Sequence, residues 1–284
     1  MPGPLLVVDA PSLLYRAFYG LPTTITGTGD QPVNALLGSV NMIWREADEH
    51  DPRAVVCCFG PDAAPYRTEL YPGYHAERPP MPDELAPQWQ QAPSLYAALG
   101  WHCDRRDDLE ADDLLGSYAI AEREAGGGTL IMTGDRDMYQ CADDVTTVLY
   151  VKTGSRGAEV VDAAEVERRY GVTPTQVPDF IALRGDPSDG LPGAKGIGEK
   201  TAASLLQRHG SLEGVLAVRD EQTPRIAGSL GDSASVLADF KEIATLRTVG
   251  VTVPPDRGLD RAQGAETARA LGMNGLAERL ETAG

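Results

Sequence analysis

The stretch Thr129-Leu-Ile-Met-Thr-Gly-Asp-Arg-Asp137 indicates the fold of this chain. The run Thr129–Thr133 is short, mostly apolar and preceded by three glycines, which is typical of a strand buried in a parallel sheet. Two carboxylates, Asp135 and Asp137, follow almost directly. Because ligands bind at the carboxyl ends of the strands in an open α/β sheet, this stretch predicts both a strand and part of a site.

Outward from this stretch, apolar runs alternate with helical patterns. Residues 5–8 and Ala54–Phe59 have the same buried-strand pattern, and residues 147–151 are a weaker fourth candidate. Between these runs, apolar residues recur at helical spacing over three segments, 33–49, 93–99 and 112–125. This order predicts an α/β fold with a mostly parallel central sheet flanked by helices.

We expect the chain to divide at about Gly171. Residues 1–170 would form the α/β core, and 284 residues are enough for one large domain or two intimate ones. Within the core, residues 60–92 contain seven prolines and are predicted to form a long irregular insertion. Such insertions are often functional lids. Residues 171–284 show short helices and loops without strands, which predicts a separate helical region.

Acidic residues occur at equivalent places in several motifs. Any one of them reads as an ordinary helix cap. Crowding so many carboxylates together, however, raises their pKa values and costs stability unless cations hold them. Oxygen ligands without His or Cys favour Mg²⁺ or Mn²⁺, and the number of acids suggests two or more ions. The candidates in the core are Asp9, Glu110, Asp112, Asp113, Asp135 and Asp137.

A second acidic motif opens the stretch Gly185-Asp-Pro-Ser-Asp-Gly-Leu-Pro-Gly-Ala-Lys-Gly-Ile-Gly-Glu-Lys-Thr201. Asp186 and Asp189 are three residues apart, a spacing at which both can bind one metal ion. The glycines that follow allow the backbone to approach a ligand closely, and amides at a helix N-terminus favour phosphate. The stretch is not a nucleotide-binding P-loop, because Glu199 separates the last glycine from Lys200.

The composition limits the partners of this chain. Its 25 basic and 42 acidic residues give a formal net charge of −17, which argues against loose coating of DNA. Residues 184–210 are locally less acidic and could contact a backbone. Four cysteines without C-x-x-C spacing and four scattered histidines make a zinc site unexpected. Without a basic leader or a long apolar run, we expect a soluble, cytoplasmic protein with no membrane contact.

Six motifs in order make the chain resemble the 5′-nucleases of the flap endonuclease group, including the 5′→3′ exonuclease domain of bacterial DNA polymerase I. The first is Val8-Asp9 with Tyr15-Arg16, and the next four are Tyr66-Arg67, Tyr74-His-Ala-Glu-Arg78, Glu110-Ala-Asp-Asp113 and Thr133-Gly-Asp-Arg-Asp-Met-Tyr-Gln140. The sixth runs from Gly185-Asp186 through Lys200-Thr201 and is highly specific. The resemblance implies a PIN/resolvase-like nuclease core, a helical arch, and a C-terminal helical region of the helix–hairpin–helix type that binds duplex DNA.

The resemblance also implies roles for individual residues. One metal would be held by Asp9, Glu110, Asp112 and Asp113, and a second cluster would consist of Asp135, Asp137, Asp186 and Asp189. Arg16 and Arg78 would neutralise phosphate near the cut, His75 would stand where relatives contact the scissile phosphate, and Tyr74 would stack on a terminal base. The duplex backbone, with a K⁺ ion as in relatives, would be held by Gly193, Lys195, Gly196, Gly198, Lys200 and Thr201.

Three positions depart from the family pattern. Phe59-Gly60 stands where Phe-Asp is usual, and the nearest acid is Asp62, two residues on. His75 replaces a lysine, and a mostly neutral imidazole is a weaker partner for phosphate at pH 7. Ser188-Asp189-Gly190 replaces Ser-Asp-Asn, a milder change. The first two could lower the catalytic rate, favour Mn²⁺ or make activity depend on pH.

The function implied is that of a metal-dependent, structure-specific 5′ nuclease that acts on flaps and 5′ ends in replication and repair. Its partner would be branched or 5′-ended duplex DNA, and a monomer is expected. Two alternatives stay open at this point. One is a branched-DNA binding protein with little or no catalysis, and the other is a ribonuclease built on a similar acidic core.

Overall fold

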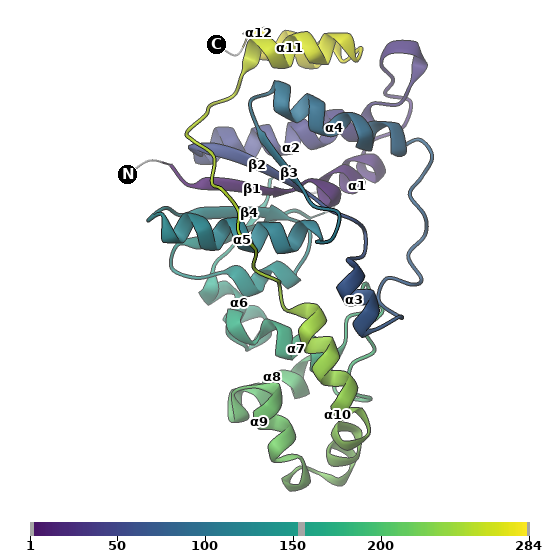
Figure 1. Ribbon diagram of the computed structural model, residues 1–284, viewed down its shortest axis with the longest axis vertical. Coiled ribbons are helices and arrows are strands. Elements are labelled where there is room, and N and C mark those ends of the chain that lie inside the picture. Colours follow the sequence, from purple (N-terminus) through teal and green to yellow (C-terminus); the bar gives the residue numbers. More distant parts are fainter. Residues whose placement is uncertain (1–2, 153–156, 283–284) are drawn as a thin grey trace.

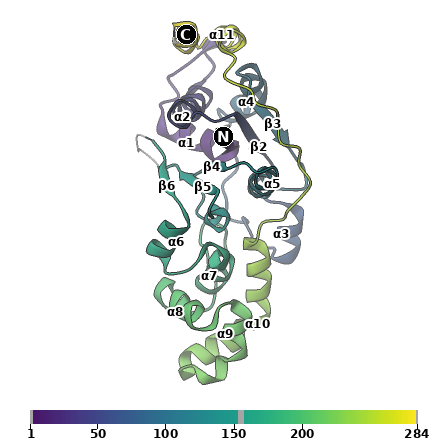
Figure 2. The same cartoon turned by 90° about the vertical axis from the view of Figure 1, so that its left-hand side faces the viewer.

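The structure is a computed structural model that describes residues 3–152 and 157–282. Its centre is a six-stranded sheet with the strand order β3-β2-β1-β4-β5-β6. The first five strands are parallel, and β6 runs antiparallel at the edge (Figures 1 and 2). The strands are β1 (Leu5–Asp9), β2 (Ala54–Phe59), β3 (His102–Arg105), β4 (Thr129–Thr133), β5 (Thr146–Tyr150) and β6 (Glu159–Val161).

The four predicted strands are confirmed as β1, β2, β4 and β5, with ends shifted by one residue at most. The two edge strands, β3 and β6, were not predicted. Both are short, and most of their residues are exposed or half-buried, so neither has an apolar run that would identify it. The fold class is as predicted: a mostly parallel sheet between helices.

Two hydrophobic cores lie on the two faces of the sheet, and alternate residues of β1 serve both. Leu6 and Val8 face the first core, whereas Leu5 and Val7 face the second. The first core is covered by α1 (Ala10–Gly20), α2 (Asn34–His50), α4 (Ala86–Ala98), α11 (Arg261–Ala270) and α12 (Asn274–Thr282). The second includes α5 (Ala111–Glu124), α6 (Ala163–Tyr170), α7 (Val177–Arg184), α8 (Glu199–His209), α9 (Leu212–Ala217) and α10 (Pro224–Ala244).

The insertion at residues 60–92 is more regular than predicted. It contains α3 (Pro65–Leu70), a run of turns, and the first half of α4. The predicted helix at 93–99 therefore begins earlier, at Ala86. Pro87 lies in the first turn of α4, where a missing N–H costs nothing, and Pro93 is tolerated inside the helix. The many prolines masked this helix in the sequence.

The helical region extends from one end of the core, and the chain then returns (Figure 1). From α6 to α10 the helices pack on one another, and the 21-residue α10 packs against α7. An extended segment then runs back over the core, where Arg53 Nη1 donates to the Pro254 carbonyl at 2.8 Å. α11 and α12 finally pack beside α4 at the opposite end. No helix in the described ranges is long and apolar enough to cross a membrane.

Candidate metal and phosphate site

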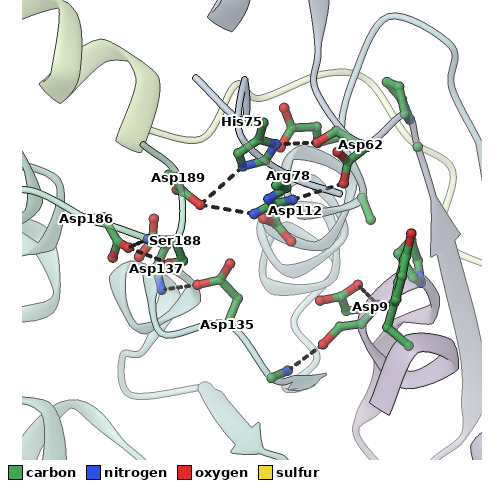
Figure 3. Close-up of a pocket in the computed structure, with 18 of the residues that line it drawn as sticks. Asp9, Asp62, His75, Arg78, Asp112, Asp135, Asp137, Asp186, Ser188 and Asp189 are labelled. Carbon is green, nitrogen blue, oxygen red and sulfur yellow. Dashed lines mark hydrogen bonds and ion pairs between the residues drawn. The ribbon is translucent and has the colours of Figure 1, made fainter. Parts of the chain in front are cut away.

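A cavity of about 850 Å³ opens where β1, β2 and β4 end. It is lined by residues from the strand ends, the 60–92 insertion and the loop after α7, as Figure 3 shows for a part of it. The structure brings seven of the eight predicted metal ligands to its wall: Asp9, Glu110, Asp112, Asp135, Asp137, Asp186 and Asp189. It also brings Arg16, Tyr74, His75 and Arg78 there.

Asp9 combines a local structural role with its place in the cavity. One carboxylate oxygen accepts from the Ser12 backbone N–H at 3.0 Å and caps α1. The other accepts from the Thr133 hydroxyl at 2.7 Å, which ties the end of β1 to the end of β4. Burial raises the pKa of Asp9. The capping interpretation and the site interpretation of this residue are therefore compatible.

Asp112, Asp135 and Asp137 line the same cavity, and no ion pair reaches their side chains within residues 3–152 and 157–282. The Asp137 N–H donates to Asp135 Oδ1 at 2.9 Å. Desolvation in the cavity, followed by the charge of Asp189, raises the pKa of Asp135 to about 6. Desolvation, together with neighbouring carboxylates, raises the pKa values of Asp112 and Asp137 well above the ordinary range. Crowded carboxylates in a poorly solvated site are costly unless a cation is present.

The donor set fits hard divalent cations. The acids of the cavity offer carboxylate oxygens, and within the described residues no hydrogen bond or ion pair reaches the side chains of Asp112 and Asp137. The carboxylates nevertheless stand apart, as like charges do. Across the described part of the chain, the group of three acids or histidines with ligand atoms within 4.8 Å of one another is Glu46, Glu49 and His50, on α2.

Asp113, the eighth predicted ligand, lies outside the cavity and is fully buried. Its oxygens accept from the Tyr66 hydroxyl, from Arg67 Nη2 and from the Arg247 backbone N–H, at 2.9–3.1 Å. Asp113 therefore joins α5 to the insertion and to the segment after α10. The sequence could not separate this structural acid from its neighbour Asp112, because both lie in the same short motif.

Glu110 borders the cavity, but both of its oxygens have protein partners. Oε1 accepts from the Ala64 N–H at 2.7 Å, and Oε2 accepts from the Tyr74 hydroxyl at 2.9 Å. Arg67 Nη1 lies 2.9 Å from Oε2 as an ion pair. Tyr74 is itself 5 % exposed, and its ring stacks on His75 at 3.8 Å between centroids. Tyr74 is thus positioned to orient Glu110, and the stacking on a base that the resemblance implies stays a prediction.

Aromatic side chains that were not predicted as site residues line another part of the cavity. Tyr15, Tyr19 and Trp89 form a row, with ring centroids 6.5 Å apart for the tyrosines and 5.9 Å for Tyr15 and Trp89. Tyr19 is 70 % exposed. Arg16, one turn away on α1, donates to the Gly134 carbonyl at 2.7 Å. Tyr15 and Tyr19 share a helix face at i and i+4, which is the signal that could have identified them.

Gly60 has no room for a side chain. A Cβ atom there would lie 2.4 Å from the Leu109 carbonyl oxygen and 2.8 Å from the Ala111 nitrogen. The backbone before α5 thus occupies the space that an aspartate at this position would need. The local packing therefore requires glycine at this position, where the family usually has aspartate.

The predicted phosphate-binding turn runs from Gly193 to Thr201. It directly follows the loop after α7 that contains Asp186 and Asp189, which we call the acidic loop. Gly193 and Gly196 have φ of +63° and +78°, a conformation that favours glycine. Gly198 is the N-cap of α8 and makes no side-chain cap, so the amides of Glu199 and Lys200 face no intrahelical acceptor. The side chains of Lys195 and Lys200 are exposed, and the half-buried Thr201 lies in the first turn of α8.

A cation from another helix also reaches this turn. A Cβ on Gly196 would lie 2.7 Å from Arg225 Nη2, so the guanidinium group of Arg225 rests on the glycine. Ser229, one turn further along α10, donates its hydroxyl to the Lys195 carbonyl at 2.9 Å. Arg225 was not among the predicted residues, because it lies 29 positions beyond Gly196 in a segment without a recognised motif.

Comparison with known proteins gives consistent matches along the chain. Residues 4–171 match the family described as 5′-3′ exonuclease, N-terminal resolvase-like domain, and residues 172–265 match its C-terminal SAM fold. A "5′-3′ exonuclease" of Streptomyces coelicolor is 36% identical, over 98% of this chain and 99% of its own length. A "5′-3′ exonuclease" of Mycobacterium tuberculosis is 35% identical, over 100% and 98%.

Longer relatives and solved structures agree. DNA polymerase I of Mycobacterium bovis is 36% identical over 89% of this chain, which spans only 28% of that protein. The T5 D15 protein co-crystallised with metal ions has the same fold, with a TM-score of 0.69, 15% identity and coverage of 98% and 97%. The catalytic core of Rad2 in complex with DNA substrate has a TM-score of 0.65, 13% identity and coverage of 98% and 91%.

Proposed function

The chain belongs to the 5′-3′ exonuclease family, and from this premise we propose that it cleaves DNA at flaps and 5′ ends in replication and repair. One observation carries the proposal: seven carboxylates line a single cavity at the strand ends, and a glycine turn with exposed lysines follows two of them. A metal site beside a phosphate-binding turn is what hydrolysis of a nucleic-acid backbone requires.

Two or more Mg²⁺ or Mn²⁺ ions are the proposed cofactors. When bound, such ions activate the attacking water and stabilise the leaving oxygen of a phosphodiester. The carboxylates that would hold them are Asp9, Glu110, Asp112, Asp135, Asp137, Asp186 and Asp189. We leave Asp113 out, because it lies outside the cavity and is fully buried.

The other residues of the cavity would bind and orient the substrate. Arg16, His75 and Arg78 line it and would offset the charge of the phosphates next to the cut. Tyr15, Tyr19 and Trp89 provide flat faces on which unpaired bases of a 5′ end would stack. The cavity would then take a phosphate at its acidic wall and a base at its aromatic wall.

The duplex would be held on the turn from Gly193 to Thr201. Backbone amides at the start of α8 and the side chains of Lys195 and Lys200 would contact phosphates, and Arg225 would add a third cation. A K⁺ ion at this turn is part of the proposal. Contacts of this kind are independent of sequence, as a structure-specific nuclease needs.

The experiment is a cleavage assay with an end-labelled 5′-flap duplex in Mg²⁺, in Mn²⁺ and in EDTA. Metal-dependent release of a short 5′ product is expected, and Asp135→Asn should nearly abolish it while the variant still binds DNA. Matched RNA flaps test the ribonuclease alternative, and light scattering tests the expected monomer. Tight binding without cleavage in either metal would contradict the proposal.

A further inference from the structure

Asp62 connects the two cationic residues of the 60–92 insertion. Its Oδ1 accepts from Arg78 Nη1 at 3.0 Å, and its backbone carbonyl lies 2.5 Å from His75 Nδ1 (Figure 3). One residue therefore contacts both side chains that point toward the acidic loop. The carboxylate side chain of Asp62 is 63% exposed, so it lies at the rim of the cavity and not among the buried acids.

The other ends of the same two side chains meet on Asp189. Arg78 Nη2 donates to Asp189 Oδ1 at 3.1 Å, and His75 Nε2 lies 3.1 Å from the same oxygen. The His75 backbone N–H also donates to the Asp189 carbonyl at 3.1 Å. Both ring nitrogens of His75 thus face oxygen atoms of other residues, Asp62 on one side and Asp189 on the other.

The backbone of the two segments approaches closely at this point. A Cβ on Gly190 would lie 2.5 Å from the Gly73 carbonyl oxygen, so a larger residue there would push the segments apart. Gly190 also has φ of +75°. Its replacement of the usual asparagine therefore belongs to the same contact that places His75 and Arg78 on Asp189.

The position of Asp62 follows from the packing around Gly60. A carboxylate cannot stand on residue 60, because the backbone at Leu109 fills the space, and Asp62 is the next acid along the chain. An exposed ion pair such as Asp62–Arg78 contributes little to stability. It can still fix the direction of a guanidinium group, whose planar donors are useful only in the correct orientation.

We propose that Asp62 is a positioning residue, which acts through Arg78 by holding its guanidinium group in the orientation needed at the reacting phosphate. This inference rests on the proposed function, since Arg78 has a role only if the cavity binds phosphate. Asp62 does not contact the substrate itself. Asp62 places a carboxylate at the rim of the cavity, whereas Gly60, directly after β2, has no side chain.

The test compares Asp62→Asn with wild type by single-turnover cleavage of a 5′-flap duplex in Mg²⁺. The cleavage rate should fall about 10-fold, with flap affinity little changed, because misorientation of a positioned group affects the reaction step more than binding. Asp62→Glu should restore most of the rate. Glu77→Gln is the matched control, since Glu77 is an exposed acid in the same turn region and has no hydrogen bond or ion pair among the described residues.

A double-mutant cycle identifies the partner. In an Arg78→Ala background, Asp62→Asn should cause no further loss, because the group it orients is gone. An unchanged rate for Asp62→Asn, or an equal loss in both backgrounds, would overturn the positioning role. A faster rate would also overturn it and would mean that Asp62 competes with phosphate for Arg78.

The same assay distinguishes this inference from the proposed function. A wild-type chain that cleaves in neither metal would contradict the nuclease function, and the positioning role with it. An active wild type that is indifferent to Asp62 would contradict only the positioning role. Because Asp62 is exposed, the melting temperature of Asp62→Asn should match that of wild type, which excludes unfolding as the cause of a slower rate.

Discussion

Aspartate side chains at neighbouring positions have different roles. Asp113 accepts three kinds of protein donor and holds α5 in place, whereas the side chain of Asp112, one residue earlier, has no such partner among the residues described. Asp9 does both, with a cap on α1 and a place in the cavity. The difference is that the Asp113 carboxylate faces protein hydrogen-bond donors, whereas Asp112 lines the open cavity.

The stability of the metal-free protein should reveal the crowding around Asp135. Its pKa is raised to about 6, so the folded state binds a proton that the unfolded state releases between about pH 4 and 6. The contribution of Asp135 to stability is therefore lost as pH rises through this window. Asp135→Asn should melt higher than wild type above pH 6, by about 2–4 °C for each kcal/mol regained, and the difference should shrink at pH 4.

Thermal melts in EDTA and in Mg²⁺, at several pH values, check this prediction. Mg²⁺ should raise the melting temperature of wild type more than that of Asp135→Asn, because the variant lacks a proposed ligand. Glu77→Gln serves as control and should behave as wild type. A pH-independent difference between Asp135→Asn and wild type would contradict the titration argument.

Restoring the usual aspartate at residue 60 should harm this chain. The sequence analysis associates Gly60 with a lower catalytic rate, from which a gain of activity on restoring the aspartate would follow. The structure reverses that expectation, because even a Cβ would lie 2.4 Å from the Leu109 carbonyl oxygen. Gly60→Asp and Gly60→Ala should both lose about 1–3 kcal/mol of unfolding free energy, as overpacked sites do. Urea melts and flap cleavage measure this, and a faster Gly60→Asp would refute it.

At the scale of elements, the sequence predicted what apolar runs and acidic motifs can reveal. Buried strands such as β1 and β4 have few polar residues, so their pattern is clear. The exposed edge strands β3 and β6 lack it, and the proline-rich start of α4 concealed a helix. Asp9, Asp135 and Asp137 were placed together correctly because the ends of parallel strands meet at one edge, whereas the other four acids of the cavity were assigned by their motifs and by resemblance.

The rest of the site depends on contacts between distant segments, which no local pattern encodes. Tyr74 is buried because its hydroxyl meets Glu110, 36 positions away. Arg225 reaches Gly196 through the packing of α10 on the turn before α8. The sequence indicates a missing acid at Gly60, whereas the structure shows that the Leu109 backbone fills the space where its side chain would be. All three features depend on tertiary packing.

The turn before α8 and the first turn of α10 should act together on duplex DNA. Lys200→Ala and Arg225→Ala should each weaken duplex binding without regard to sequence and lower the slope of log K against log salt by about one unit. Arg269→Ala on α11, at the opposite end of the molecule, is the control (Figure 1). Titrations at several salt concentrations measure the slope. A wild-type slope for Arg225→Ala would remove α10 from the duplex contact.

At the scale of the whole molecule, the C-terminal helices α11 and α12 return to pack on the α/β core. After the helical region, the extended segment passes Arg53, and α11 and α12 complete the core on the first face of the sheet. Their buried side chains belong to the same cluster as α1, α2 and α4. The predicted division at residue 171 stays a prediction, but residues 261–282 pack with the α/β layers and away from the turn proposed to bind the duplex.

Loosening this packing should lower stability and spare the chemistry. Leu280 is fully buried in the first core, so Leu280→Ala should cost about 3 kcal/mol, or roughly 6–12 °C in melting temperature. Flap cleavage at 20–25 °C, well below the melting transition, should stay near the wild-type rate. Glu278→Ala, an exposed position on the same helix, is the control. A wild-type melting temperature for Leu280→Ala would show that α12 is not part of the folded core.

The loop after α7 has one more consequence. Asp189, in the cavity, and Gly196, at the duplex-binding turn, are seven positions apart, so the chain between them spans at most about 25 Å. A duplex bound at this turn, as proposed, would have its nearest phosphates within a limited distance of the acids. On the proposed function, the length of this loop would limit how far from the paired region a strand is cut, whatever bases the strand carries.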